Sequence, residues 1–293
     1  MKRLFIINPK SGKGSANKAL QRAIEKYFPG APVIFTERKG HAQSIAAQAV
    51  ADGVQQLIVA GGDGTINEVV QSLAFSDTAL GIIAKGSGNG LARELGCPLN
   101  NFDAACQNIL NASAVSCDLG RAGADYFINL AGVGIEADIA DKFDKHGKRG
   151  MLPYFKIGAR AVLNYKPPVT EVILDNKETK TLSPLTLVFA NGRQYGSNFR
   201  IAPKASLRDG LLDMVIVEDA NKFRLFLSLP NFFADGASPV KATKTHKIKK
   251  AEVKIKGSFC YHIDGEPKTA QDSLAIEIIP SAIKLLMIDS KRY

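Results

Sequence analysis

The sequence predicts an α/β N-terminal domain with a parallel sheet and a C-terminal domain that is an antiparallel β-sandwich. Over the first 120 residues, short continuous apolar runs alternate with helical patterns, which is typical of a parallel sheet covered on both faces. After about Asp118, closely spaced runs without intervening helices favour antiparallel strands, and one of them alternates apolar and polar residues with period two. We therefore expect domains at residues 1–125 and 126–293, although the last segment can return to the first domain.

The N-terminal half contains four apolar runs that we interpret as buried strands. The expected strands are residues 4–7, 33–36, 57–60 and 80–84, and the expected helices are residues 16–27, 42–51 and 65–74. Two of the connecting loops are rich in glycine, namely Gly61–Gly64 after the third strand and Lys85–Gly90 after the fourth. Ligands of parallel sheets bind beyond the carboxyl ends of the strands, so these loops are the expected binding site.

The C-terminal half contains strand candidates at short spacing, with turn residues between them. The candidates are residues 169–174, 185–189, 211–217, 251–256, 259–263, 274–279 and 283–288. Crowding of this kind is typical of an antiparallel sandwich or barrel.

Composition narrows the class of protein. With 45% hydrophobic and 23% charged residues, the chain has ordinary globular composition, which excludes disorder. Its formal net charge of +10 should attract a polyanion: nucleic acid, an anionic membrane surface or a phosphorylated ligand. The four cysteines lack metal-site spacing, which favours free thiols in a reducing compartment. Because no run approaches the roughly 18 apolar residues of a membrane span, we expect a cytoplasmic protein that can still contact a membrane.

The strongest local signal is the glycine loop within Leu57–Glu68. Adjacent glycines let the backbone approach phosphate oxygens, and the following helix N-terminus favours an anion. Thr65 is expected to cap that helix, and Thr65 with Glu68 fits a capping box, so a structural role for Glu68 stays open. Asp63 suits a nearby divalent cation or a protein base. Neither a Walker A pattern nor a Rossmann fingerprint is present.

Further motifs follow one another from residue 7 to residue 266. In order, they are Ile7–Gly12, Thr36–Ala42, Gly61–Thr65 with Asn67–Val69, Gly86–Asn89, Asp118–Gly120, Asp209–Asp213 and Asp264–Glu266. This ordered set resembles the diacylglycerol kinase catalytic domain family, which includes sphingosine and ceramide kinases and soluble bacterial lipid kinases. The glycine loop alone is shared with NAD kinases and resembles a loop of phosphofructokinase, so the resemblance implies a first domain of that fold.

The resemblance also implies ATP and Mg²⁺ as cofactors, with the nucleotide held chiefly by its phosphates. The implied nucleotide residues are Asn8, Thr36, Gly61, Gly62, Asp63, Gly64, Thr65, Asn67, Ser87, Gly88 and Asn89. Asp209, with carbonyls of Ser206 and Leu211, would bind a largely structural metal, while Asp63 and Asp118 would belong to the acidic network around the catalytic magnesium.

The resemblance implies that Glu266 accepts the proton of a lipid hydroxyl, with Asp264 beside it, so the implied catalytic residues are Glu266, Asp63 and Asp264. Gly90 stands where many family members have Asp, and this departure alters the expected metal shell.

Several features also have plain structural interpretations. Asp209-Gly210 and Asp264-Gly265 are hairpin signals in their own right. His41 lies at a helix start, where it could cap the helix or face water. His262 alternates with apolar neighbours and is expected on a strand surface, and Lys10 and Lys13 are expected to be solvated loop residues, although either could touch phosphate.

Two segments could contact a membrane. Lys241–Lys256 carries seven lysines against the single acid Glu252, which is typical of a solvated face but would also attract anionic lipid. Phe223–Phe233 is rich in Phe and Leu, which favours core packing, or the lip of an acyl-chain channel if it is exposed. Few aromatic residues accompany the lysines and no recognition motif matches, so we do not expect nucleic acid as a partner.

Together with the resemblance, the sequence predicts an ATP- and magnesium-dependent kinase that phosphorylates the hydroxyl of a lipid such as diacylglycerol or a sphingoid base. Glycine loops and Glu266 would face each other between the domains, and a homodimer would be unsurprising. One alternative is an NAD kinase, against which the Asn8-Pro9 opening and the Asp264–Glu266 turn argue. The other is a nucleotide-binding membrane adaptor without turnover, which Gly90 favours.

Overall fold

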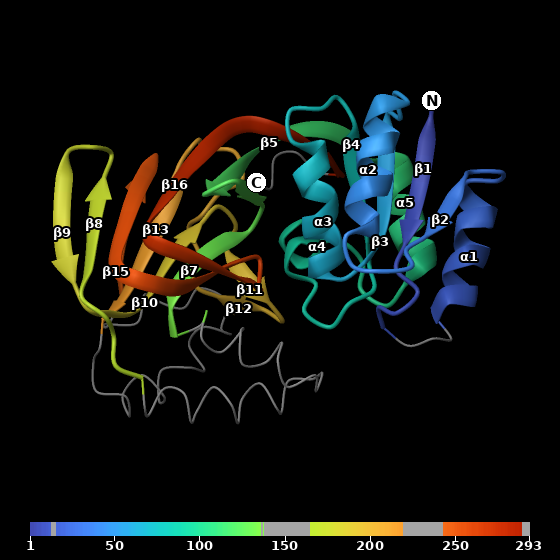
Figure 1. The fold of residues 1–293 in the computed structure, drawn as a ribbon. Helices are drawn as coiled ribbons and strands as arrows, with labels where there is room; N and C mark the ends of the chain where they lie inside the picture. Colours follow the sequence, from blue (N-terminus) through green and yellow to red (C-terminus); the bar gives the residue numbers. More distant parts are fainter. Residues whose placement is uncertain (13–15, 136, 138–164, 219–242, 289–293) are drawn as a thin grey trace. The chain divides into compact units, whose positions relative to one another are not determined.

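A computed structural model describes residues 1–12, 16–135, 137, 165–218 and 243–288 (Figure 1). The described residues divide into two compact units. The first lies within residues 1–119, 207–209 and 280–288, and the second within residues 120–206 and 210–279. The boundary at Leu119 precedes the residue 125 expected from the sequence, and residues 280–288 belong to the first unit.

The first unit is built on a parallel sheet, as the sequence predicts. Its strands are β1 (Arg3–Ile7), β2 (Val33–Phe35), β3 (Gln56–Gly61) and β4 (Ala79–Ala84), in the order β2-β1-β3-β4. The end of β16 (Glu266–Met287) adds a further parallel strand beside β4, with Lys284 opposite Ala79. Every residue of β3 and β4 is buried, which is expected where helices cover both faces.

Five helices accompany this sheet. They are α1 (Ala16–Tyr27), α2 (His41–Ala51), α3 (Asp63–Leu73), α4 (Gly90–Glu94) and α5 (Phe102–Asn111). Side chains of α1 and α5 share one core with strand residues such as Phe5, Ile58 and Ile83. Helices α2 and α3 lie side by side (Figure 1); α2 contacts β1, and α3 contacts β3 and β4. The helices predicted within residues 16–27, 42–51 and 65–74 are confirmed, whereas α4 and α5 were not predicted.

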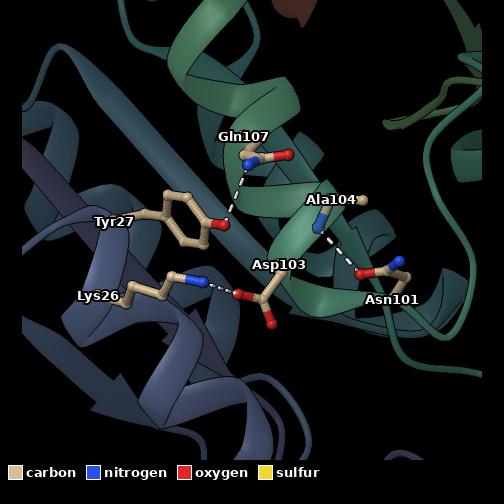
Figure 2. A network of polar contacts seen from close by, with 6 residues as sticks. All are labelled: Lys26, Tyr27, Asn101, Asp103, Ala104 and Gln107. Atoms are coloured by element: carbon tan, nitrogen blue, oxygen red, sulfur yellow. Dashed lines mark hydrogen bonds and ion pairs between the residues drawn. The ribbon is translucent and has the colours of Figure 1, made fainter.

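Polar contacts join the end of α1 to the start of α5 (Figure 2). Lys26 Nζ lies 2.8 Å from Asp103 Oδ1, and Gln107 Nε2 donates to the Tyr27 hydroxyl at 3.1 Å. Asn101 caps α5, because its Oδ1 accepts the amide hydrogen of Ala104 at 3.0 Å. Both side chains of the Lys26–Asp103 pair are more than half exposed, so water weakens the attraction between them.

The second unit is antiparallel, as predicted. Its strands are β6 (Asp125–Phe127), β7 (Leu130–Gly134), β8 (Thr170–Leu174), β9 (Glu178–Leu182), β10 (Pro184–Ala190), β11 (Gln194–Gly196), β12 (Phe199–Arg200), β13 (Leu212–Glu218), β14 (Thr243–Ile248) and β15 (Lys250–Ile263). Neighbouring strands run in the order β14-β13-β10-β7-β15, and β8 and β9 extend the first half of β15. One core cluster contains Phe127, Val172, Phe189 and Met214, which come from four different strands.

Two long strands replace pairs of shorter ones that the sequence predicts. Residues 251–256 and 259–263 form one strand, β15, and residues 274–279 and 283–287 lie within β16. The register of β15 shifts between Lys254 and Ser258, where Gly257 adopts a φ of 85°. The glycine thus marks a bulge that bends the strand, whereas the sequence pattern suggested a break. Within the described ranges, no helix is long and apolar enough to cross a membrane.

Candidate functional site

The order of the parallel strands defines where a ligand is expected to bind. The chain passes from β1 to β2 on one side and then to β3 on the other, so the connection changes direction between β1 and β3. Loops that follow strands at such a point diverge and leave a crevice at the carboxyl ends. Asn8 follows β1 and Gly62 follows β3, so both lie at this point.

The glycine loops after β3 and β4 pack against each other. A Cβ atom added to Gly86 would lie only 2.6 Å from the Cα of Gly62, and one added to Gly61 would lie 2.8 Å from the Cβ of Thr65. Position 86 therefore needs glycine because the backbone of Gly62 approaches so closely, and position 61 because the Thr65 side chain does. The sequence explained the glycines by access to phosphate; the structure gives them a second reason.

Side chains fix the loops at this edge. Asn8 Nδ2 donates to the Thr65 hydroxyl at 2.9 Å, and Asn8 Oδ1 accepts the amide hydrogen of Lys10 at 2.9 Å. Asn89 forms two hydrogen bonds of 2.8 Å with the backbone of Gly86, which closes the loop after β4. Thr36 is buried and donates its amide hydrogen to Ile7 at 2.9 Å, so the end of β2 lies beside the end of β1.

The predicted capping role of Thr65 is wrong. Helix α3 begins at Asp63 with Gly62 as its N-cap, because Gly62 adopts an extended conformation directly after β3. Thr65 therefore lies inside the first turn. Glu68 does have the structural role that was left open, but on another helix: its carboxylate accepts amide hydrogens of Gly40 at 2.8 Å and Ala42 at 3.2 Å. Glu68 thus caps α2.

His41 is the first residue of α2. Its Nδ1 accepts the amide hydrogen of Glu37 at 3.1 Å, so it stabilises the loop before the helix. This hydrogen bond supports a structural role for His41 at the start of the helix rather than a catalytic one.

Asp63 contacts the loop after β4. Its Oδ1 accepts the amide hydrogen of Gly90 at 2.6 Å, and a Cβ on Gly88 would lie 2.9 Å from its Oδ2. Among the described residues, no three His, Cys, Asp or Glu side chains gather into a metal cluster. Magnesium commonly binds through one or two carboxylates, phosphate oxygens and water, so Asp63 fits as the carboxylate of a nucleotide-bound ion.

The structure therefore brings the predicted nucleotide residues to one edge of one unit. They are Asn8, Thr36, Gly61–Thr65, Asn67 and Ser87–Asn89, and they lie in the loops after β1 to β4 and in the first turns of α3. Ser87 is exposed, whereas Asn67 is buried within α3.

Lys85 also lies at this edge, as the first residue of the glycine loop after β4, although no motif includes it. It directly follows β4 and is only 5% exposed. Its Nζ donates to the carbonyl of Asn8 at 2.9 Å and to that of Ser11. Lys10 is exposed, as expected for a solvated loop residue, and Lys13 lies outside the described residues. The sequence does contain a signal for this residue, because Lys85 stands between a wholly apolar strand and a glycine loop.

Asp118 lies at the opposite edge of the first unit. Its Oδ1 accepts the amide hydrogen of Ser281 at 2.8 Å, and Ala282 accepts that of Phe75, which comes after the end of α3. Ser281 also precedes the pairing of Lys284 with the first residue of β4. The glycine loops, by contrast, follow the carboxyl ends of β3 and β4. The expected acidic network requires Asp118 to lie near Asp63, and the structure does not bring the two residues together.

The segment that carries Asp209 passes close to Asp118. The amide of Asp118 donates to the carbonyl of Leu207 at 2.7 Å, and Arg208 and Asp118 both line a polar cavity of about 520 Å³. The residues predicted to bind metal thus fall into two groups, with Asp63 at the glycine loops and Asp118 near the chain that leads to Asp209. The site of Ser206, Asp209 and Leu211 itself stays a prediction.

The second unit carries the predicted Asp264–Glu266 turn. Asp264 and Gly265 connect β15 to β16, with φ values of 48° and 86° and Ile263 paired with Glu266, so the predicted hairpin is confirmed. The Asp264 carboxylate accepts three amide hydrogens, from Ile128 at 2.9 Å, Asn129 at 2.9 Å and Leu130 at 3.0 Å. Asp264 therefore ties the turn to the start of β7.

His262 lies beneath this turn. It is 2% exposed, its ring centroid is 5.8 Å from that of Tyr195, and its Nδ1 accepts the amide hydrogen of Gly265 at 3.4 Å. The prediction of a surface position is wrong, because β15 is flanked here by β7 and β16 and Tyr195 packs against the imidazole. Glu266, the first residue of β16, is half-buried.

Several lysines of the basic segment Lys241–Lys256 pair with carboxylates. Lys244 pairs with Glu218 at 2.5 Å, Lys247 with Asp213 at 3.2 Å and Lys254 with Glu171 at 3.7 Å. Lys241 and the aromatic segment Phe223–Phe233 lie outside the described residues.

A parallel sheet with glycine loops at its carboxyl edge, followed by an antiparallel β unit, fits a class of two-domain kinases. Comparison with known proteins agrees with this class. Residues 2–122 match the diacylglycerol kinase catalytic domain, and residues 129–287 match the YegS C-terminal NAD kinase beta sandwich-like domain. The chain therefore belongs to the diacylglycerol kinase family, and by that membership it is a phosphotransferase.

Individual relatives support the assignment over almost the whole chain. A diacylglycerol kinase of Mycobacterium tuberculosis is 31% identical over 96% of this chain and 93% of its own length. A probable lipid kinase of the YegS type from Chromohalobacter salexigens is 30% identical over 96% and 91%. The crystal structure of a putative diacylglycerol kinase from Bacillus anthracis superposes with a TM-score of 0.82 over 98% and 95% of the two chains, at 23% identity, and shows the fold alone.

Proposed function

We propose that this protein transfers the γ-phosphate of ATP, with Mg²⁺, to the hydroxyl of a lipid alcohol such as diacylglycerol or a sphingoid base. The observation that carries the proposal is the assembly of Asn8, Thr65 and the two glycine loops at the carboxyl edge of the parallel sheet. Relatives named diacylglycerol kinase and lipid kinase support the lipid as acceptor.

The first unit has the chemistry that a triphosphate needs. Helix α3 begins at this edge, where the amides of Thr65 and Ile66 donate to the carbonyl of the N-cap Gly62, and its first turn lies next to Asn8 because the Asn8 side chain bonds Thr65. Such a helix N-terminus stabilises a phosphate. In the proposed reaction, magnesium held beside Asp63 would neutralise charge that develops on the transferring group.

The second unit supplies the proposed base. Glu266 would accept the proton of the lipid hydroxyl while this oxygen attacks the γ-phosphorus. Asp264, which the resemblance placed among the catalytic residues, is better suited to hold the turn, because its carboxylate already accepts three amide hydrogens. We therefore treat Asp264 as a positioning residue.

The test is transfer of label from [γ-³²P]ATP to a panel of lipid alcohols in mixed micelles, with NAD as a competing acceptor. We expect a labelled lipid that requires magnesium. Labelled NADP with no labelled lipid would identify an NAD kinase, and tight ATP binding without any product would identify a non-catalytic adaptor.

The lipid would be reached at a membrane surface, and we propose an electrostatic contact. Support comes from the net charge of +10 and from the exposed residues Lys249, Lys250 and Lys256, for which no ion pair is found among the described residues. Binding to vesicles that contain phosphatidylserine should weaken as salt rises, because screening shortens the range of the attraction. Replacing Lys249 and Lys250 by Glu should weaken it further than replacing the paired Lys244 by Glu.

A further inference from the structure

Lys85 is a buried cation at the edge that the proposed nucleotide would occupy. It lies between β4 and the glycine loop, and its side chain crosses to the loop after β1, where the carbonyls of Asn8 and Ser11 accept hydrogen bonds from its ammonium group. Only 5% of the residue is exposed. The motifs that indicate nucleotide binding do not include it.

The charge of Lys85 has no acidic partner among the described residues. Its ammonium contacts are two neutral carbonyls. Residues 13–15, which follow the loop of Ser11 and lie outside the described residues, are Lys, Gly and Ser, so none of them is acidic. Burial lowers the pKa of Lys85, and no neighbouring carboxylate opposes that effect. Burying an unpaired charge is costly, so the position calls for an anion.

The two carbonyls do not use all the hydrogen-bond donors of the Lys85 ammonium group. A lysine ammonium has three donors, and two of them are directed to the carbonyls of Asn8 and Ser11. A third hydrogen can bond a ligand without breaking either contact.

A second feature points to an anion at the same place. The carbonyl of Asn8 accepts from Lys85, while the side chain of Asn8 donates to Thr65 in the first turn of α3. The next residue, Gly86, packs on Gly62, the N-cap of that helix. The positive end of the α3 dipole and a buried ammonium group therefore meet at one edge.

We propose that Lys85 binds a phosphate group of the nucleotide. The proposal rests on the proposed function and adds to it a charged contact made by this residue. Lys85 keeps its two bonds to the loop after β1 and gives its third hydrogen to a phosphate oxygen, so the same side chain holds the loop and neutralises the ligand.

A different role would be purely structural, in which Lys85 only holds the loop through its two hydrogen bonds. Lys85→Gln separates the two roles, because the amide still donates hydrogen bonds but carries no charge. Lys85→Met removes both. Lys18→Met is the matched control, since Lys18 is an exposed residue of α1 in the same unit and its replacement changes net charge equally.

The measurement is calorimetric titration of each protein with adenosine, AMP, ADP and ATP, without lipid. For Lys85→Gln and Lys85→Met, we expect ATP affinity to fall about tenfold to a hundredfold while adenosine affinity changes less than about twofold. Lys18→Met should bind all four ligands like the unmodified protein. Thermal unfolding without nucleotide verifies that each variant is folded.

Two results would overturn the proposal: unchanged ATP affinity in Lys85→Gln, or an equal loss of affinity for adenosine and ATP. Both would assign Lys85 to the loop alone. The lipid assay separates this failure from failure of the proposed function. A protein that labels lipid while Lys85→Gln binds ATP normally refutes only the role of Lys85. A protein that shows the phosphate-dependent loss but labels no lipid refutes only the lipid kinase.

Discussion

The dipeptide Asp-Gly occurs in the candidate site residues of both units, but it starts a helix in the first unit and forms a hairpin turn in the second. Asp63-Gly64 opens a helix directly after a buried strand, and the Asp63 carboxylate bonds the amide of Gly90. Asp264-Gly265 forms a hairpin turn, and the Asp264 carboxylate bonds three consecutive amides. The flanking sequence determines the backbone conformation of each Asp-Gly pair, because a helical pattern follows Gly64 and a strand follows Gly265.

The difference shows that an acidic residue in a motif can join two neighbouring loops, as Asp63 does, or hold a hairpin turn, as Asp264 does. At the first-unit edge, glycines bring two loops into backbone contact, and the hydrogen bonds that fix these loops are shared among Asn8, Asp63 and Asn89. At the second-unit turn, one aspartate joins three amides, and its neighbour Glu266 is the group proposed for chemistry. The motif residues therefore differ in what their replacement should change.

The largest effect is expected at Asp264. Asp264→Ala would leave the amides of residues 128–130 without their acceptor and should lower the free energy of unfolding by roughly 3–5 kcal/mol, since each unsatisfied buried donor costs about 1–3 kcal/mol. Urea denaturation measures this loss. Asp264→Asn retains one acceptor oxygen and should lose less; equal stability of Asp264→Ala and the unmodified protein would contradict the structural role.

Glu266→Gln tests the chemical side of the comparison. Turnover should fall by about 10²-fold or more, in line with loss of a general base, while ATP affinity and stability stay close to normal. Initial rates with a labelled lipid measure it. Glu252→Gln is the control, because Glu252 is a half-buried glutamate of β15 that accompanies Lys254. Near-normal turnover in Glu266→Gln would remove Glu266 from its role.

Gly86→Ala tests whether the first-unit loops depend on backbone contact. The added methyl group would meet Gly62 Cα at 2.6 Å, so the loops must separate, at a cost of about 1–3 kcal/mol in unfolding free energy and with weaker ATP binding. Gly62→Ala, whose nearest contact is 3.3 Å, should cost less. The reverse ranking in denaturation and ATP titration would show that the loops are not held by this approach.

Glu68→Ala should have a smaller effect, about 1 kcal/mol in unfolding free energy, because it removes the cap of α2. Glu37→Ala is a suitable control, since the Glu37 side chain is exposed and only its backbone amide contacts His41. Denaturation curves that overlap for Glu68→Ala and the unmodified protein would contradict the assigned cap.

The smallest effect concerns the thiols. Burial raises the pKa of Cys97 and Cys117 to about 12 and that of Cys106 to about 11. At pH 8, these thiols should react with Ellman's reagent at least about a hundredfold more slowly than in urea, because the thiolate is the reactive form. A raised pKa in the folded state also means that stability falls as pH rises above about 9. Rapid labelling of Cys97, Cys106 or Cys117 in the folded protein, located by peptide mapping, would contradict their raised pKa values.

Much of the first unit could be predicted from the sequence because its signals are local. Four apolar runs and three helical patterns each specify an element, and their alternation specifies a parallel sheet. The role of Glu68 could not be predicted, because the amides that it caps are 26 and 28 residues away. Lys85 was missed for the same reason, since its partners at Asn8 and Ser11 are 77 and 74 residues away.

In the second unit, strand periodicity predicted the antiparallel class but not the strand lengths. Gly257 suggests a break in the pattern, yet it only bends β15. His262 was misplaced because alternation distinguishes two faces of a strand, whereas packing of Tyr195 covers the second face. The turn at Asp264 was predictable because Asp-Gly suits two residues with positive φ.

The pairing of Lys284 with Ala79 has a consequence for biosynthesis. Strand β4 is apolar along its whole length, and its outer neighbour is encoded about two hundred residues later. Until those codons are translated, the nascent first unit presents an uncovered strand edge, the kind of surface that invites association between chains. The sheet of the first unit therefore stays incomplete for most of translation. A premature stop near codon 280 would release a product whose β4 edge is unpaired and prone to association.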